Sequence, residues 1–338
     1  MSESKAMILG VSGLQLTAEE KALFAGERPW GFIVFARNLS EREQICDLVA
    51  SMRDAVGRPD APVLIDQEGG RVQRIREPLL PRYPSAAVLG EIYKRNAGQG
   101  LRAAWLMSRL HAFDMKSFGI NVDCLPVLDV PVEGASNVIG NRAYGFDPDT
   151  VSAMGRAAAD GLTAGGVLPV MKHIPGHGRG MADSHHELPV VSTSLGELEA
   201  HDFPPFRDMA DSLMAMSAHV VYSAIDPDRP ATISRKVIDE VIRGSIGFNG
   251  LLISDDASMN ALKGTLGERA RAIATNGCDI TLHCNGVMDE MRAVVAEVGP
   301  LAGEALRRTK AVEAAFGQDD GAEESVIRAE FDGMGAYS

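Results

Sequence analysis

Eight short apolar segments recur along the chain, and most of the stretches between them carry the periodicity of helices. Each segment has the length of a buried strand and is too short for a helix. Strands that alternate with helices pack as a parallel sheet covered by helices. We therefore predict an α/β fold, specifically a single-domain (β/α)8 TIM barrel, which typically needs about 250 residues. The expected strands cover residues 7–11, 31–35, 62–66, 121–123, 166–171, 213–216, 250–254 and 279–282.

The main alternative is a nucleotide-binding fold, because 338 residues are also enough for two ordinary domains. However, no G-x-G-x-x-G pattern follows the first apolar segment, and the sequence contains no Walker loop. Both absences disfavour this alternative. We predict one catalytic barrel domain over residues 1–317. Acidic residues punctuated by glycine then predict a loose acidic surface tail over residues 318–338.

Local signals also predict helix boundaries. Thr17 and the glutamate three residues later form a capping-box pattern at the start of a helix. Ser40 is expected to cap a helix over residues 42–56 in the same way. One long helix is expected over about residues 90–118.

Charge and cysteine usage narrow the class of protein. The chain has 33 Lys and Arg against 46 Asp and Glu, a formal net charge of −13, which argues against general binding to nucleic acid or to anionic membranes. No apolar run is long enough to span a bilayer, and no secretory signal pattern precedes the first strand. The four cysteines lack C-x-x-C spacing, as is typical of reduced thiols. We expect a cytoplasmic monomer that acts on a small molecule and binds neither nucleic acid nor membrane.

Half of the eight histidines lie within residues 173–186, directly after the fifth apolar segment. Pro175 and the neighbouring glycines exclude regular structure, so we expect an exposed loop over residues 174–187. In this loop, Asp183 precedes His185 by two residues. An anionic aspartate raises the proton affinity of an imidazole and selects its tautomer, so the pair is suited to proton transfer.

Polar residues follow several of the predicted strands, and in a barrel such residues converge on one site. Asp255 follows a hydrophobic strand, where a rigid carboxylate suits a nucleophile at an anomeric carbon or a stabiliser of an oxocarbenium-like transition state. Asp256 is interpreted as a cap of the next turn. The other strand-end candidates are Asp66, Asp123, Asp129, Lys172, His173 and His219.

His173 and His177 have the spacing of a helical metal-binding pair. Pro175 and Gly176 lie between them and break any helix, so the two imidazoles need not share a face. We interpret His177 as packing the loop. A metal-dependent barrel hydrolase stays open as an alternative to a metal-free enzyme.

Four motifs in order resemble the β-N-acetylglucosaminidases of glycoside hydrolase family 3, the NagZ-type enzymes. The residues at 172–178, together with Asp183 and His185, are similar to the signature loop of that family. The other three motifs are residues 65–74, 137–145 and 253–259. The resemblance extends over about residues 6–317. Ile174 stands where an aromatic residue is usual, and Ala257 where leucine is usual.

The resemblance implies a retaining exo-β-N-acetylglucosaminidase that needs no metal or organic cofactor. It implies removal of non-reducing N-acetylglucosamine from peptidoglycan fragments that carry 1,6-anhydro-N-acetylmuramic acid, in cell-wall recycling. Asp255 would be the nucleophile, His185 the general acid/base and Asp183 its partner. The residues implied to hold the sugar are Asp66, Arg74, Arg142, Lys172 and His173.

Further alternatives come from other classes of function. A non-catalytic sugar-binding protein is disfavoured because Asp255, Asp183 and His185 are all present. An N-acetylglucosaminide phosphorylase would use the same covalent intermediate and transfer the sugar to phosphate. Another β-glycosidase of the same family would keep the chemistry and change the sugar.

Overall fold

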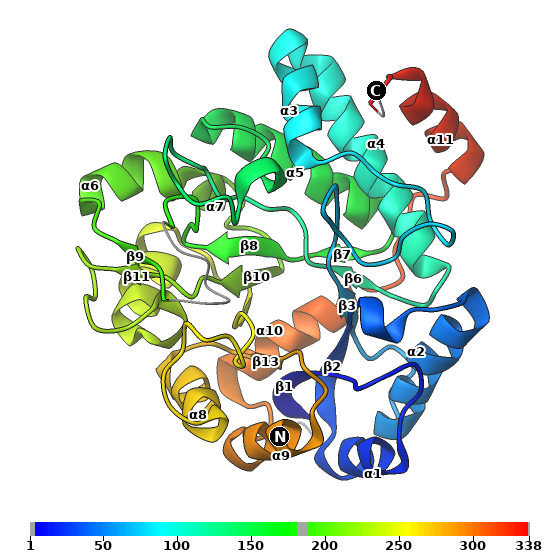
Figure 1. The fold of residues 1–338 in the computed structure, drawn as a ribbon, viewed down its shortest axis with the longest axis vertical. Coiled ribbons are helices and arrows are strands. Elements are labelled where there is room, and N and C mark those ends of the chain that lie inside the picture. Colours follow the sequence, from blue (N-terminus) through cyan, green and yellow to red (C-terminus); the bar gives the residue numbers. More distant parts are fainter. Residues whose placement is uncertain (1–3, 181–187, 337–338) are drawn as a thin grey trace.

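The computed structural model describes residues 4–180 and 188–336. Nine strands pair in parallel in two sheets, and the helices lie around them (Figure 1). The first sheet has the order β13-β1-β2-β3-β6-β7, formed by β13 (Thr281–His283), β1 (Lys5–Gly10), β2 (Pro29–Val34), β3 (Val63–Ile65), β6 (Val122–Asp123) and β7 (Leu168–Pro169). The second has the order β12-β10-β8, formed by β12 (Leu251–Ile253), β10 (Met214–Ser217) and β8 (Met171–Ile174).

The two sheets adjoin each other at both ends. Only Val170 separates β7 in the first sheet from β8 in the second. At the other end, Ile253 of β12 forms a parallel bridge with Ile280, the residue before β13. Each of the eight predicted apolar segments therefore contains a strand, and the α/β single-domain fold is confirmed.

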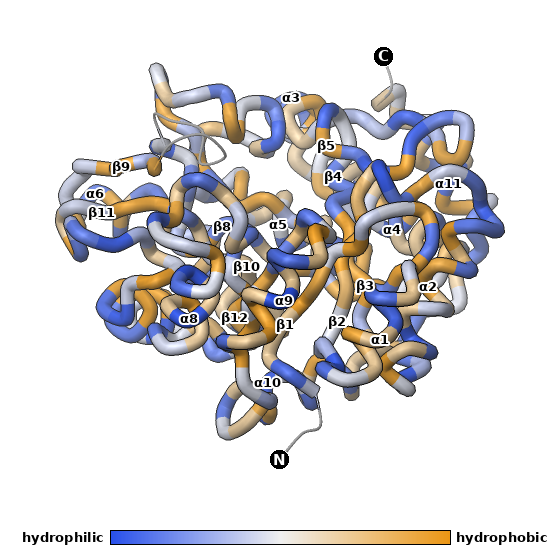
Figure 2. The backbone as a smooth tube through the Cα atoms, turned by 60° about the horizontal axis from the view of Figure 1, so that its bottom comes forward, coloured by the Kyte–Doolittle hydropathy of each residue, from blue (hydrophilic) through white to orange (hydrophobic). Residues whose placement is uncertain are grey.

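The central strands supply the core because their side chains are apolar on both faces, as expected for parallel strands covered by helices. All six residues of β2 are buried, and Trp30 and Phe32 are fully enclosed. Figure 2 shows hydrophobic residues concentrated along the central strands and hydrophilic ones mainly in the outer helices and loops.

Two small strand pairs are additions to the prediction. β4 (Gln67–Gly69) and β5 (Val72–Gln73) form an antiparallel hairpin directly after β3. β9 (Val190–Val191) pairs in parallel with β11 (Val221–Tyr222). β4 and β5 are largely polar, and β9 and β11 have two residues each, so none of the four contains an apolar run of the length that predicts a buried strand.

The helices connect and cover the strands. They are α1 (Ala18–Glu27), α2 (Arg42–Val56), α3 (Ala86–Arg95), α4 (Ala97–Lys116), α5 (Pro148–Ala164), α6 (Leu195–Glu197), α7 (Pro204–Asp208), α8 (Leu266–Asn276), α9 (Met288–Glu297), α10 (Gly303–Ala314) and α11 (Glu324–Gly333). Within the described ranges, every helix falls short of the length and apolar character that crossing a membrane requires.

The capping box at Thr17 is confirmed, but two other predictions about helices are wrong. Glu41, not Ser40, is the N-cap residue of α2, and no side chain caps that end. The long helix expected over residues 90–118 is interrupted at Asn96. The side chain of Asn96 accepts a hydrogen bond from the backbone N–H of Gln99 at 3.1 Å, so it ends α3 and caps α4.

The expectation of a loose tail after Gly317 is also wrong. Residues 324–333 form α11, which lies against α4 (Figure 1). Ile327 and Phe331 are buried, and Arg102 of α4 holds Glu330 through two hydrogen bonds of 2.7 Å. The prediction relied on the acidic composition of this segment and overlooked Ile327 and Phe331. Their i, i+4 spacing is typical of the buried face of a helix. The domain boundary at residue 317 stays a prediction.

Candidate active site

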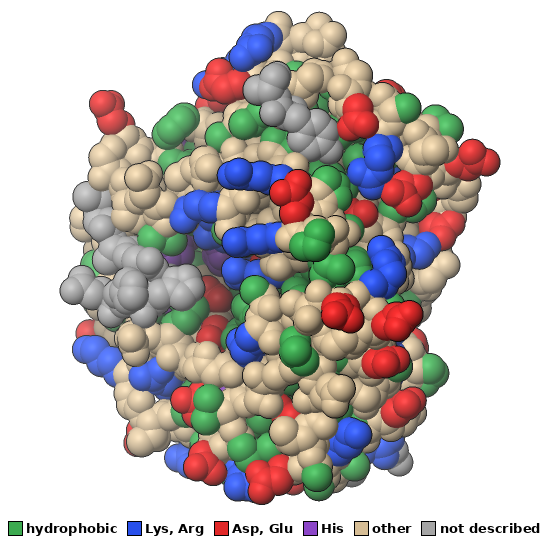
Figure 3. Space-filling view, turned by 45° about the vertical axis from the view of Figure 1, so that its right-hand side comes forward, with side chains coloured by type: hydrophobic (Ala, Val, Ile, Leu, Met, Phe, Trp, Pro, Cys, Tyr) green, Lys and Arg blue, Asp and Glu red, His purple; other side chains and the backbone are tan. Residues whose placement is uncertain are grey.

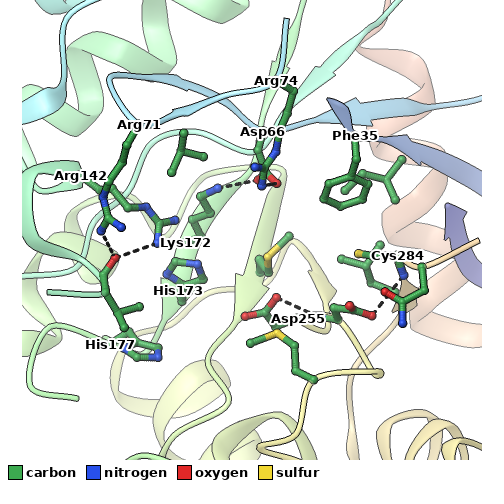
Figure 4. Close-up of a pocket in the computed structure, with 18 of the residues that line it drawn as sticks. Phe35, Asp66, Arg71, Arg74, Arg142, Lys172, His173, His177, Asp255 and Cys284 are labelled. Carbon is green, nitrogen blue, oxygen red and sulfur yellow. Dashed lines mark hydrogen bonds and ion pairs between the residues drawn. The ribbon is translucent and has the colours of Figure 1, made fainter. Parts of the chain in front are cut away.

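A cavity of about 430 Å³ lies where the carboxyl ends of the strands meet. Asp66 follows β3, Lys172 and His173 belong to β8, and Asp255 follows β12. Figure 4 shows these side chains around one open space, with Arg74 and Arg142 beside them. The structure therefore brings together six of the predicted site residues, namely Asp66, Arg74, Arg142, Lys172, His173 and Asp255.

Lys172 is the centre of an ionic network on one wall of this cavity. Its buried Nζ lies 2.8 Å from Oδ1 of Asp66 and 2.6 Å from Oε1 of Glu68. Arg74 binds the other oxygen of Asp66 at 2.9 Å. Burial opposes ionisation of Asp66, but the charges of Lys172 and Arg74 outweigh it and hold the pKa of Asp66 well below its usual value. Burial likewise opposes the charge on Lys172, yet the two carboxylates raise its pKa.

Glu68 is a site residue that the sequence analysis did not single out. Both of its oxygens bind Arg142, at 2.8 and 2.7 Å, and one of them also binds Lys172. Burial opposes its charge, but Arg142 and Lys172 lower the pKa of Glu68 to about 2. Glu68 thus orients two of the predicted sugar-binding cations. The sequence feature that could have identified Glu68 is its position, two residues after Asp66 and within the motif at residues 65–74.

Asp129 orients His173 from outside the cavity. Its Oδ2 lies 2.7 Å from Nδ1 of His173, and its Oδ1 accepts hydrogen bonds from the backbone N–H groups of His173 and His177 at 3.2 and 2.6 Å. Burial raises the pKa of Asp129, but the neighbouring imidazoles and these hydrogen bonds lower it by more, to about 2. An ionised carboxylate only accepts, so Nδ1 of His173 carries a hydrogen.

The segment after Ile174 is buried as far as the structure describes it, which corrects the expectation of an exposed loop. All of residues 174–180 are buried except Arg179. Gly178 permits this packing, since a Cβ there would lie 2.0 Å from the carbonyl oxygen of Val130. The rest of the predicted loop, including Asp183, His185 and His186, lies outside the described residues.

His177 lines the cavity edge-on to His173, with 5.8 Å between the ring centroids. Burial lowers the pKa of His177. Within residues 4–180 and 188–336, no group of three or more His, Cys, Asp or Glu side chains could hold a metal ion.

Asp255 and Asp256 have different surroundings although they are adjacent. Both residues line the cavity, and Oδ1 of Asp255 accepts a hydrogen bond of 2.8 Å from the backbone N–H of Asp256. The Asp256 carboxylate accepts hydrogen bonds of 3.1 Å from the backbone N–H groups of Ser258 and Cys284. Its predicted role as a turn cap is confirmed, and it also ties this turn to the end of β13.

Two other strand-end candidates lie behind the cavity. Asp123 is fully buried, and its Oδ1 accepts a hydrogen bond of 3.0 Å from the backbone of Gln67. Burial raises the pKa of Asp123 well above its usual value. His219 is buried beside the backbone of Asp256. Neither residue lines the cavity.

The sequence analysis also missed several residues of the cavity wall. They follow the ends of β2 and β13 or come from the β4–β5 hairpin, and include Phe35, Arg37, Arg71, Cys284 and Asn285. The strand-end rule could have found four of them. Arg71 lies between the two strands of a hairpin that the sequence analysis did not predict.

Comparisons with known proteins agree with this arrangement. Residues 2–311 match the family described as Glycosyl hydrolase family 3 N terminal domain. A beta-hexosaminidase of Alkalilimnicola ehrlichii is 40% identical, and one of Bordetella avium is 37% identical. Each match covers 82% of this chain and 80% of the relative.

The fold is also similar to solved structures. The crystal structure of NagZ from Neisseria gonorrhoeae in complex with N-trifluoroacetyl-D-glucosamine superimposes with a TM-score of 0.86 at 33% identity. The match covers 99% of this chain and 97% of that one. A family match over more than half of the chain and relatives above 30% identity lead to one conclusion: the chain belongs to glycosyl hydrolase family 3.

Proposed function

We propose that this chain is a retaining exo-β-N-acetylglucosaminidase. In this proposal it acts as a cytoplasmic monomer in cell-wall recycling. Its substrates are peptidoglycan fragments carrying 1,6-anhydro-N-acetylmuramic acid, from which it removes the non-reducing N-acetylglucosamine. Support for the enzyme class comes from the beta-hexosaminidases that it resembles and from NagZ, which was solved with a glucosamine derivative.

The observation that carries the proposal is the paired, ionised wall of the cavity opposite Asp255. A sugar ring presents hydroxyl groups that both donate and accept hydrogen bonds, so its site needs fixed acceptors and fixed donors. Asp66 supplies acceptor oxygens, and Arg74 and Arg142 supply N–H donors. Lys172 has three N–H groups, of which Asp66 and Glu68 take two and leave one for a sugar oxygen.

The proposed chemistry is a double displacement with net retention. The Asp255 carboxylate attacks the anomeric carbon while His185 gives a proton to the leaving glycosidic oxygen, which yields a glycosyl-enzyme. His185 then takes a proton from water, the water oxygen attacks the anomeric carbon, and Asp255 is released. Asp183 would hold the His185 ring and favour its protonated form. The location of Asp255 supports its part, and the sequence motif supports His185 and Asp183.

The fold proposed for this chemistry is a closed (β/α)8 barrel. Three observations support it: the parallel pairing within both sheets, the single residue between β7 and β8, and the bridge between Ile253 and Ile280. A barrel would explain why residues from β3, β8 and β12 meet at one cavity.

A phosphorylase is the second candidate, because the cavity wall is rich in cations that could hold a phosphate acceptor. Arg37, Arg71, Arg74, Arg142 and Lys172 all line it. Three of them are paired with Asp66 or Glu68, whereas Arg37 and Arg71 bind neutral backbone carbonyl groups. The rate and the product at increasing phosphate concentrations separate the two reactions, since a phosphorylase releases the sugar 1-phosphate.

The decisive experiment compares aryl β-glycosides that share one leaving group. We expect the specificity constant for the N-acetylglucosaminide to be at least about tenfold above those for the glucoside and the xyloside. The glucoside and the xyloside have no acetamido group, so the protein groups that bind it would be left without a hydrogen-bond partner. Equal constants would overturn the proposed substrate. Activity should also withstand EDTA, whereas a loss that added metal restores would favour the metalloenzyme alternative.

A further inference from the structure

Beside the active-site cavity, three arginines line two further hollows of about 480 and 410 Å³. Arg71 and Arg82 line both hollows, and Arg76 lines the larger one. Arg71 also lines the active-site cavity, so the hollows adjoin it there. We call the surface formed by Arg71, Arg76 and Arg82 the arginine groove. Figure 3 shows Lys and Arg side chains gathered beside the hollow in which histidine is visible.

No ion pair within the described residues involves any of the three arginines, which bind backbone groups or lie open to solvent. Arg71 donates to the backbone carbonyl oxygens of Asn137 and Ile139, at 2.7 and 3.2 Å. Arg76 donates to the carbonyl oxygen of Gln73 at 2.6 Å. For none of the three does the described part of the chain supply an ion pair, and Arg82 has no hydrogen-bond partner there either.

This concentration of positive charge runs against the composition of the chain, whose formal net charge is −13. It also differs from the active-site wall, where Arg74 and Arg142 are each paired with a carboxylate. Hydrogen bonds to the backbone hold Arg71 and Arg76 in place, so binding an anion there costs less side-chain entropy. Two of the three cations of the groove, those of Arg71 and Arg76, are therefore preorganised next to the proposed sugar site.

We propose that the arginine groove binds a carboxylate on the aglycone, the part of the substrate that leaves. This inference rests on the proposed function, because it assumes that the cavity beside Asp255 holds the sugar that is removed. Arg71 is common to the cavity and the groove, so an aglycone that leaves the cavity past Arg71 meets Arg76 and Arg82. A guanidinium group matches the two oxygens of a carboxylate. Glu77, which also lines the groove, lowers its net charge and so favours a singly charged ligand over a doubly charged phosphate.

The test uses two disaccharides with the same bond to be cleaved. One is N-acetylglucosaminyl-β-1,4-N-acetylmuramic acid, whose lactyl group carries a free carboxylate, and the other is its methyl ester. The wild-type chain should have a higher kcat/KM for the acid. Added salt should narrow this difference, because exposed charges are screened within about 10 Å at 0.1 M.

Two variants and one control locate the effect. Arg82→Gln should lower kcat/KM for the acid about two- to fivefold, the range of an exposed ion pair, and leave the ester unchanged. Arg76→Gln combined with Arg82→Gln should remove most of the preference. Arg292→Gln is the matched control, since Arg292 is an exposed arginine on α9 that lines neither hollow.

Equal kcat/KM values for acid and ester in the wild-type chain would overturn the inference. An equal loss on both substrates in Arg82→Gln would overturn it too. A neutral aryl N-acetyl-β-glucosaminide tests the proposed function separately, since its aglycone has no carboxylate. If no glycoside is hydrolysed, NMR titration of the wild-type chain and of Arg82→Gln with N-acetylmuramic acid and its methyl ester tests the groove. The inference is supported if Arg82→Gln binds the acid more weakly than the wild type does and binds the ester equally well. It is refuted if the two chains bind the acid with equal affinity.

Discussion

Nε2 of His219 lies 3.0 Å from the backbone carbonyl oxygen of Asp256, the residue that follows Asp255. A carbonyl oxygen only accepts, so Nε2 carries a hydrogen. On the other side of the ring, Nδ1 lies 2.8 Å from Oγ1 of Thr232, which in turn lies 2.8 Å from Oγ of Ser217. His219 thus connects the end of β10 with the turn that presents the proposed nucleophile.

We expect His219→Ala to lower kcat by up to about 10²-fold with a smaller change in KM, because a small displacement of a reacting group can have that effect. His219→Gln should recover much of the activity, since its amide can donate to the Asp256 carbonyl group. Steady-state kinetics on an aryl substrate, together with melting temperatures, check this. If the two variants are equally impaired at equal stability, His219 does not act by positioning.

Asp255→Ala should abolish turnover and leave the melting temperature nearly unchanged, because the carboxylate lines an open cavity. A 5-fluoro glycosyl fluoride should label the wild-type chain on the peptide that contains Asp255. Tandem mass spectrometry locates the label. A label on Asp256, or none, would disprove the assignment of the nucleophile.

His185→Ala should slow cleavage of a sugar–sugar bond by about 10²–10⁴-fold and that of a dinitrophenyl glycoside much less, because the second leaving group needs no proton. Asp183→Ala should show a milder form of the same pattern. The measurement is a plot of log rate against the pKa of the leaving group, in which both variants should have a steeper slope than the wild type.

His173→Ala is the matched comparison for that plot, because Asp129 holds Nδ1 of His173 at 2.7 Å as a proton-transfer pair would. If His173 only binds the sugar, His173→Ala should lower the rate by the same factor for every leaving group, so that its line runs parallel to that of the wild type. If instead the line for His173→Ala is steeper than that of the wild type and the line for His185→Ala is parallel to it, His173 is the general acid/base.

Glu68→Gln should destabilise the chain at neutral pH by about 3–5 kcal/mol, since it leaves Lys172 and Arg142 without one buried anion. The pKa of Glu68 is lowered in the folded state to about 2, from an ordinary value of 4.5. Its contribution is therefore full above about pH 4.5 and is lost as the pH falls toward 2.

Urea unfolding of the wild type and Glu68→Gln at several pH values measures this dependence. The difference in unfolding free energy between them should shrink as the pH falls from 5 toward 2. A difference that does not change with pH over this range would mean that the charge of Glu68 contributes nothing to stability.

The sequence by itself determined the features that depend on neighbours along the chain. The eight apolar segments predicted the strands, because a short apolar run is stable mainly as a strand buried in a sheet. The side chain of Thr17 caps its helix through atoms three residues away. Residues at strand ends, such as Asp66 and Asp255, could be expected to meet, since parallel strands bring their carboxyl ends together.

Only the tertiary structure decided how the charges of the site are paired. Lys172 and Asp66 are 106 residues apart, and Arg142 and Glu68 are 74 residues apart, so no local pattern connects them. The same limit applies to the packing of α11 on α4 and to the burial of residues 174–180. Pairing of this kind depends on distances of about 3 Å and on the exclusion of water, and both exist only once distant segments have packed.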